Sequence, residues 1–173
     1  ETGDFKFCEF NTDGASAMNE DRELNLAFSK SVAYKNFQKT HFMYSLELFD
    51  SWVDEALKLY HGMDENTERK PFVAIVDFME NATINEFVIF KDRFEEKGCE
   101  VEICDIRELK WTGDTCVTPK GSKVDLIYRR AVTSDIMSHY LELSDFIMAV
   151  KNEAVVLIGD FRTQIVHNKI LFK

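Results

Sequence analysis

After Pro71 the sequence alternates short apolar runs with stretches of helical periodicity, and this alternation constrains the fold more than any other feature. The apolar runs have the length of buried strands, and they cover residues 72–78, 99–104, 124–128 and 154–158. Between them, residues 84–97 form an amphipathic helical pattern ended by Gly98, and residues 134–150 form another that we expect to break near Leu143. Strand-helix-strand order implies right-handed crossovers and parallel pairing. We therefore predict a Rossmann-like, doubly wound, mainly parallel α/β sheet of about four strands.

The first third of the chain has a different pattern. Residues 4–10 alternate enough to predict a strand, whereas apolar residues recur at helical spacing over 20–44 and again over 46–60. A polar connector at 64–71 makes the best internal boundary. We therefore divide the chain into an N-terminal strand with a helical segment at residues 1–69 and a Rossmann-like domain at residues 70–173. Within that domain, residues 109–123 predict a small hairpin.

Composition limits the class of protein. A chain of 173 residues that is 45% hydrophobic can bury one good core. Its formal net charge of -10 argues against nucleic acid or an anionic membrane surface as the main partner. No apolar run approaches the roughly 20 residues that span a bilayer, and the four cysteines lack the spacing of a zinc site. These features predict a cytoplasmic enzyme piece with reduced thiols.

Polar residues follow each predicted strand of the sheet. Asp77 ends the first strand, Asp105 ends the second, Arg129 and Arg130 end the third, and residues 159–163 follow the fourth. In an open parallel sheet, ligands bind beyond the carboxyl ends of the strands. This edge is therefore the expected binding site.

The arginines at this edge are candidate substrate-binding residues. A planar guanidinium donates two parallel hydrogen bonds to a carboxylate or phosphate, which suits Arg129, Arg130 and Arg162 to this role. For Arg129 and Arg130, a structural ion pair with Asp125 or Asp135 is an equally weighted alternative.

A second candidate site lies near the N-terminus. Glu9 and Asn11 are two apart on the predicted strand, so both side chains would lie on one face. A carboxylate and an amide together offer the hard oxygen ligands that suit Mg²⁺. The alternative is an exposed edge strand that runs into a turn at Asp13 and Gly14.

Four stretches resemble the glutathionylspermidine synthase family, whose members are circularly permuted ATP-grasp ligases. Residues 5–13, FKFCEFNTD, resemble its E-x-N-x-D segment, and residues 124–130, VDLIYRR, look like its V-D-x-x-Y-R-R strand end. Residues 167–171, HNKIL, look like its N-K-x-x-L helix start, and the apolar run 73–77 sits where its central domain begins. The chain departs from the synthases at residues 14–15, where Gly-Ala replaces Thr-Pro.

This resemblance implies an ATP-dependent carboxylate-amine ligase that works through an acyl phosphate, with ATP and Mg²⁺ as cofactors. Glu9 and Asn11 would be metal ligands and Lys169 would contact an ATP phosphate. The partners would be a small-molecule or peptide carboxylate, an amine substrate, and the remainder of the ATP-grasp chain. We expect these 173 residues to be a fragment that is inactive alone, with a further metal-binding carboxylate before Glu1. The alternative function is a non-catalytic Rossmann-like binding or interaction module.

Overall fold

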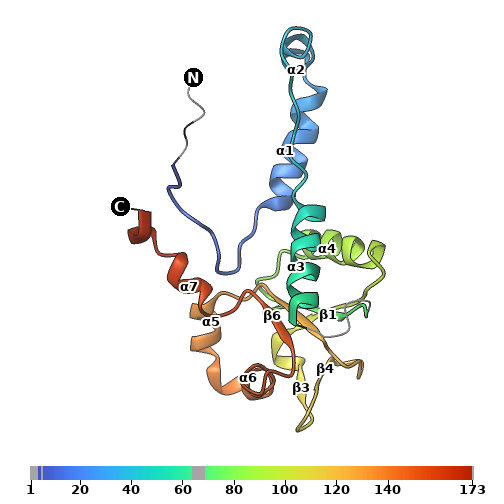
Figure 1. Cartoon of the computed structure of the whole chain (residues 1–173), viewed down its shortest axis with the longest axis vertical. Coiled ribbons are helices and arrows are strands. Elements are labelled where there is room, and N and C mark those ends of the chain that lie inside the picture. The colour runs from blue at the N-terminus through green and yellow to red at the C-terminus, as the bar shows by residue number, and fades with distance from the viewer. Residues whose placement is uncertain (1–3, 5, 64–68, 173) are drawn as a thin grey trace.

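The centre of the molecule is a four-stranded parallel sheet (Figure 1) in a computed structural model that describes residues 4, 6–63 and 69–172. The strand order is β2-β1-β5-β6, with bounds Phe72–Asp77 for β1, Glu100–Asp105 for β2, Leu126–Arg129 for β5 and Val156–Ile158 for β6. Val73 of β1 aligns with Val101 of β2 and with Leu126 of β5. The prediction of about four parallel strands in a mixed α/β fold is confirmed.

Apart from the last, the helices around the sheet lie in or overlap stretches predicted to be helical, which are residues 46–60, 84–97 and 134–150. They are α3 (Phe49–Met63), α4 (Ile84–Glu96), α5 (Thr133–Ser138), α6 (Ser144–Lys151) and α7 (Thr163–Val166), with 3₁₀ turns at Ile106–Glu108 (η1), Tyr140–Glu142 (η2) and Lys169–Phe172 (η3). Gly98 follows α4 with a φ of 87°, as the predicted helix end requires. The helical pattern over 134–150 is broken, and Leu143 lies directly before α6.

The sheet has a helical layer and a hydrophobic cluster on each face. One cluster joins Val73, Ile75 and Tyr128 to apolar residues of α3 and α4. The other joins Ala74 and Val76 to apolar residues of α5 and α6. Successive residues of a strand point to opposite faces, so β1, buried along its centre, contributes to both clusters.

Smaller predictions about the sheet domain are also confirmed. Strands β3 (Lys110–Trp111) and β4 (Cys116–Val117) pair antiparallel as the expected hairpin. All four cysteines are free thiols, and three of them are buried. Burial raises the pKa of Cys104 to about 12, which keeps this thiol protonated and unreactive near neutral pH.

Residues 4–44 differ from the predicted strand and from the single helix expected over 20–44. The described part of residues 4–10 forms no strand, so that prediction is wrong. A strand needs a neighbour for its N–H and C=O groups, whereas this segment is held by side chains, including a contact of 5.2 Å between the ring centroids of Phe10 and Phe172. The long helix is divided into α1 (Met18–Lys30) and α2 (Val32–Phe37) at Ser31, whose hydroxyl accepts the N–H of Tyr34.

The predicted boundary falls mostly on residues 64–68, which lie outside the described residues. The helix before it, α3, packs on the sheet beside α4 and contributes Phe49 and Val53 to the core. Within the described parts of the chain, no helix is long and apolar enough to cross a membrane.

Candidate functional site

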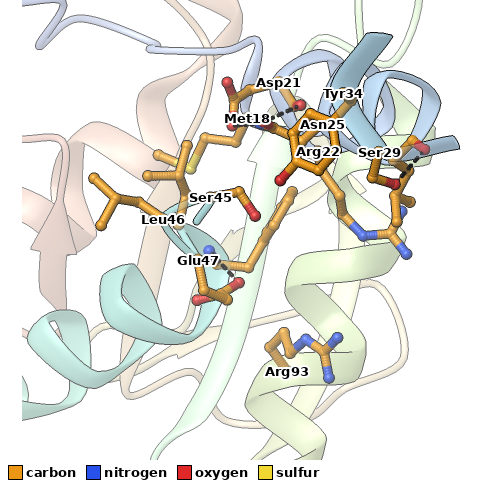
Figure 2. A pocket seen from close by; sticks show the side chains of 13 residues that line it. Met18, Asp21, Arg22, Asn25, Ser29, Tyr34, Ser45, Leu46, Glu47 and Arg93 are labelled. Carbon is orange, nitrogen blue, oxygen red and sulfur yellow. Dashed lines mark hydrogen bonds between the residues drawn. The ribbon is translucent and has the colours of Figure 1, made fainter. Parts of the chain in front are cut away.

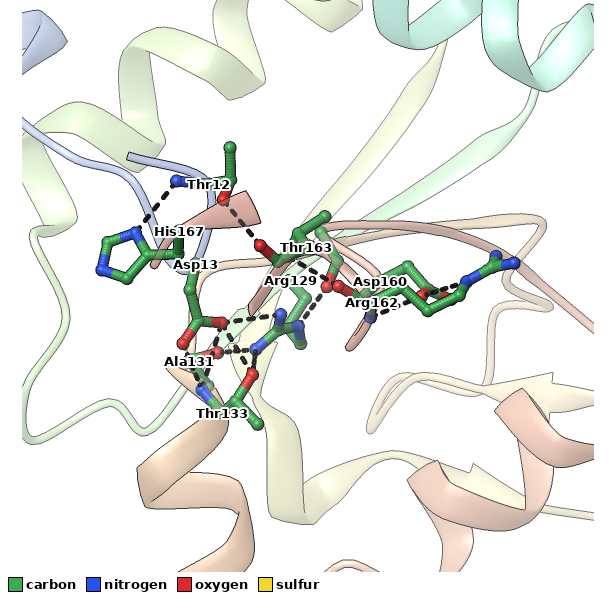
Figure 3. Close-up of polar contacts among 10 residues, drawn as sticks. Thr12, Asp13, Arg129, Ala131, Thr133, Asp160, Arg162, Thr163 and His167 are labelled. Carbon is green, nitrogen blue, oxygen red and sulfur yellow. Dashed lines mark hydrogen bonds and ion pairs between the residues drawn. The ribbon is translucent and has the colours of Figure 1, made fainter. Parts of the chain in front are cut away.

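The N-terminal segment crosses the carboxyl edge of the sheet and is fixed there by hydrogen bonds. The backbone N–H of Thr12 donates to Nδ1 of His167 over 3.3 Å, and its hydroxyl donates to the carbonyl of Thr163 over 2.8 Å (Figure 3). Thr163 and His167 lie in and just after α7, which follows β6. The N-terminal segment and α7 therefore meet at the edge where ligand binding was expected.

Asp13 is the main polar anchor of this segment. Its carboxylate accepts hydrogen bonds from the backbone N–H and the hydroxyl of Thr133, at 3.0 and 2.7 Å, and from Nη2 of Arg129 at 2.9 Å. Burial acts to raise the pKa of Asp13, but the hydrogen bonds from Thr133 and Arg129 outweigh it and hold the pKa below its usual value. Asp13 is therefore a charged group that joins the segment to β5 and α5.

Gly14 allows the chain to pass closely over the end of β5. Its φ is 63°, and a Cβ atom at this position would overlap the carbonyl oxygen of Arg130 and approach Cγ1 of Val132 to 2.7 Å. Only glycine fits both the backbone conformation and the space. The glycine at the point where this chain departs from the synthase pattern is thus required by the local packing.

Arg129 is fully buried and satisfied by its own chain (Figure 3). Its side chain is inaccessible to solvent, and it donates to the carbonyls of Gly159 and Ala131 as well as to Asp13. The guanidinium also lies 5.2 Å from the ring centroid of Phe161. Arg129 joins β5, β6 and the N-terminal segment.

Arg130 is also buried, on the other face of the sheet. Its Nη1 lies 2.6 Å from Oε1 of Glu86 and 3.0 Å from the hydroxyl of Tyr128, and its guanidinium packs over the ring of Phe87. The second carboxylate oxygen of Glu86 accepts the N–H of Asn19, which connects α1 to α4. Burial raises the pKa of Tyr128 to about 12, so this hydroxyl stays protonated.

The structure thus shows the ion-pair alternative for both arginines, with different partners from those expected. Arg129 pairs with Asp13 and Arg130 with Glu86, instead of Asp125 or Asp135. Asp125 pairs with Arg69 at the opposite end of β5. Both guanidinium groups are enclosed, so neither is presented to solvent at the sheet edge.

The remaining polar residues at the edge differ in exposure. Arg162 is largely exposed and pairs with Asp160 two residues earlier, at 2.7 Å. Asp105 accepts hydrogen bonds from the N–H groups of Met79 and Arg107. Asp77 is half-buried, and burial raises its pKa to about 6. Among the expected edge residues, Arg162 is the most accessible to a ligand.

Two residues predicted from separate motifs lie side by side. The ammonium nitrogen of Lys169 is 2.6 Å from a carboxylate oxygen of Glu9, although the two are 160 positions apart in the sequence. Lys169 is the first residue of η3, and the carbonyl of the Asn168 side chain accepts the N–H of Ile170, so the predicted helix start is present in 3₁₀ form. Asn11 is exposed on the same segment as Glu9.

The described residues contain no group of three or more His, Cys, Asp or Glu that could hold a metal ion. Glu9 and Asn11 can supply two oxygen ligands between them. Mg²⁺ commonly keeps several waters and shares its remaining positions with substrate phosphates. Each residue has the oxygen type that such an ion takes, but the strand that was expected to place both side chains on one face is absent from the described residues, and the carboxylate of Glu9 pairs with Lys169.

Some residues of this edge were not predicted from the sequence. Asp13 belongs to the E-x-N-x-D stretch, but no role was assigned to it, and Thr133 and Glu86 carry no motif. Their partners lie 44 to 120 positions away along the chain. For Glu86 the sequence did hold a signal, because it lies at helical spacing from Phe90 and Phe94 and so falls on the apolar face of the predicted helix.

Comparisons with known proteins do not identify a family. No protein-family model matches the chain, and the search of curated proteins finds no match.

Proposed function

We propose that this chain is part of an ATP-dependent carboxylate-amine ligase resembling the glutathionylspermidine synthases. The observation that supports this most directly is the contact between Glu9 and Lys169. The first was predicted to bind Mg²⁺ and the second an ATP phosphate, each from its own motif. A magnesium ion and the phosphates it neutralises must be adjacent, so the two predicted roles require the proximity that the structure has.

In this proposal the parallel sheet is the doubly wound, pre-ATP-grasp domain, and the N-terminal segment carries the metal ligands across its edge. Asp13 and Thr12 bind the segment to the sheet domain, which leaves Glu9 and Asn11 on the exposed side. The acid and amine substrates would meet ATP above the carboxyl ends of the strands, where Arg162 is the accessible guanidinium. Arg129 and Arg130 would act by holding the edge together, because both are buried and paired.

In this proposal, Glu9 and Lys169 would have to separate before either could bind its ligand. Each charge neutralises the other, and the hydrogen bond from Lys169 lowers the pKa of Glu9. Once separated, Glu9 would hold the metal and Lys169 the phosphate. The remaining nucleotide contacts would come from the rest of the ATP-grasp chain, so we expect no ATP turnover by these 173 residues alone.

The test is a pair of substitutions in the full-length ligase that contains this stretch. We expect Glu9→Gln to lower kcat by about a hundredfold or more, because it removes one charge from the metal shell while keeping the shape, and we expect higher Mg²⁺ to recover part of the loss. Lys169→Met should raise the KM for ATP.

Glu55 and Lys58 form a matched control, because they are an exposed ion pair on α3 with a distance of 3.4 Å. Glu55→Gln and Lys58→Met should leave the kinetics unchanged. Full activity of Glu9→Gln at low Mg²⁺ would remove Glu9 from the site and the proposal would lose its main support.

The second candidate is a non-catalytic Rossmann-like binding or interaction module. It is favoured by the enclosure of Arg129 and Arg130, which leaves the sheet edge with fewer free cationic groups than an anion-binding site would use. Metal-dependent ATP consumption by the full-length protein, coupled to an acid and an amine, would distinguish the ligase from this module.

A further inference from the structure

The segment from residue 24 to residue 46, which we name the basic hairpin, contributes no residue to either hydrophobic cluster of the described structure. It contains the second half of α1, all of α2 and the stretch that leads to α3, and neither α1 nor α2 buries a residue. Large apolar side chains are nevertheless exposed along it, and Phe42 is 90% exposed. The others are Leu24, Leu26, Phe28, Val32, Phe37, Tyr44 and Leu46. Figure 1 shows the two helices projecting away from the sheet.

A pocket at the base of the hairpin contacts only part of these exposed apolar side chains. It lies between α1 and the start of α3 and is lined by Met18, Asn25, Tyr34 and Glu47 among others (Figure 2). The carboxylate of Glu47 is already engaged with the N–H groups of Phe49 and Asp50 at the start of α3. Leu26 and Leu46 of the hairpin line this pocket, whereas the exposed apolar side chains farther along the hairpin do not belong to its lining.

The charge of the basic hairpin is opposite to that of the rest of the chain. Its 23 residues include Lys30, Lys35 and Lys39 and no Asp, Glu or Arg, which gives a charge of +3. The chain as a whole carries -10, so the other residues together carry -13. All three lysines are exposed. A surface that carries several exposed apolar side chains and only positive charges is complementary to a protein surface that is apolar and acidic.

The same chain presents such a surface elsewhere, which we name the acidic patch. It comprises the exposed Met137, Tyr140 and Leu141 of α5 and η2, with Leu141 93% exposed, and the exposed carboxylate of Glu142. Between residues 131 and 150 the sequence contains Asp135, Glu142 and Asp145 and no Lys or Arg. This stretch of 20 residues therefore has a formal charge of -3, opposite in sign to the +3 of the basic hairpin, and Glu142 is its carboxylate within the acidic patch. Glu142 lies 2.9 Å from Nδ1 of His139, and Asp145 lies 3.5 Å from the ammonium nitrogen of Lys110.

The two surfaces cannot meet within one molecule as it is folded. The basic hairpin includes the outer half of α1 and projects away from the sheet (Figure 1), whereas α5 packs on the sheet face opposite to α3 and α4. We propose that the basic hairpin of one copy docks on the acidic patch of a second copy of this chain. Two reciprocal contacts of this kind would close a dimer. Pairing of two hairpins with each other is disfavoured, because six lysines would be brought together.

Sedimentation of the 173-residue chain over a range of concentrations and salt concentrations tests this proposal. We expect reversible self-association that weakens as salt rises, because the contact joins opposite charges. Replacing Lys30, Lys35 and Lys39 together with Glu should weaken association by about tenfold or more. The pair Met137→Lys and Glu142→Lys on the acidic patch should do the same.

The decisive arm mixes the two variants. Each hairpin now matches the other variant's patch, so a one-to-one mixture should recover an association that neither variant shows alone. A triple replacement of Lys58, Lys120 and Lys151 with Glu is the matched control, since it makes the same change of net charge at exposed lysines elsewhere. Phe42→Ser tests the apolar part of the contact without touching the core, because Phe42 is exposed.

Three results would overturn the proposal. They are sedimentation as a monomer at every concentration, unchanged association of the lysine-to-glutamate variant, and failure of the mixed variants to associate. The basic hairpin could instead meet an anionic lipid surface. Binding of the monomeric chain to vesicles that contain phosphatidylserine, lost in the lysine-to-glutamate variant, would assign the hairpin to that partner and exclude the dimer.

Discussion

Asp77 is a residue whose environment opposes its charge. It ends β1 at the carboxyl edge of the sheet, where its Oδ1 accepts the N–H of Phe78 over 2.8 Å. Burial raises its pKa to about 6, and the neighbouring carboxylates of Asp135 and Asp105 add to this effect, while Arg130 opposes it. The folded protein therefore holds a proton on Asp77 at pH values where the unfolded chain, with a pKa near 3.9, has released it.

This difference predicts how stability depends on pH. As pH rises from about 4 to about 6, the unfolded state binds fewer protons than the folded state at this position, so the contribution of Asp77 to stability falls, and the penalty is complete above pH 6. Asp77→Asn should therefore stabilise the protein by about 1 to 2 kcal/mol at pH 7.5, after allowance for partial exposure, and by little at pH 4.5. Urea unfolding at both pH values measures the two effects, with Asp92→Asn on the exposed face of α4 as the control. An equal effect at both pH values would show that Asp77 is not the titrating group.

Residue types at the sheet edge could be predicted from the sequence, but their partners could not. The strand ends placed Asp77, Asp105, Arg129 and Arg130 at the carboxyl edge, as the structure has them. Whether an arginine at a strand end is free or buried depends on segments distant in sequence. In this protein the N-terminal segment covers one guanidinium with Asp13, which local periodicity cannot show.

At the scale of elements, the sheet and its helices follow from periodicity because their pattern and their environment agree. The apolar runs of β1 and β5 are buried, and Phe87, Phe90 and Phe94 form the core face of α4. The same reasoning predicted a strand over residues 4–10, and that prediction is wrong. The alternating residues of this N-terminal segment have no neighbouring strand among the described residues, so the pattern alone did not produce a strand.

The attachment of this segment depends on Gly14, and a substitution tests it. Gly14→Ala would force a Cβ atom against the carbonyl of Arg130 and the side chain of Val132 in addition to straining the backbone. Gly121→Ala is the matched control, because Gly121 also has a positive φ, 85°, but has open space around it. We expect a loss of about 1 to 2 kcal/mol at Gly121 from backbone strain alone, and about 1 to 3 kcal/mol more at Gly14 from the overlap. Thermal or urea unfolding measures both, and equal losses would mean that the segment is not held against β5.

At the scale of the whole molecule, burial is unevenly distributed. The two hydrophobic clusters enclose β1 and β5 between α3 and α4 on one face and α5 and α6 on the other. The basic hairpin lies outside both clusters, and α1 and α2 contribute no fully buried residue. Isolated helices of 13 and 6 residues are marginal in water, so these two depend on tertiary contacts, such as the hydrogen bond from the N–H of Asn19 to Glu86 at the base of α1.

Hydrogen exchange should therefore separate the molecule into two parts. In dilute solution, amides of β1, β5 and α4 should exchange only through global unfolding, whereas those of α2 and the second half of α1 should exchange at least a hundredfold faster, because few buried contacts oppose their local opening. Mass-spectrometric exchange on peptides from 24–46 and 72–77 measures the two classes, and the buried α3 provides an internal helical reference. Protection of the hairpin equal to that of β1 at high dilution would show that the hairpin folds as one cooperative unit with the core. Protection that rises with protein concentration only over residues 24–46 and 137–142 would mark the two surfaces that self-association covers.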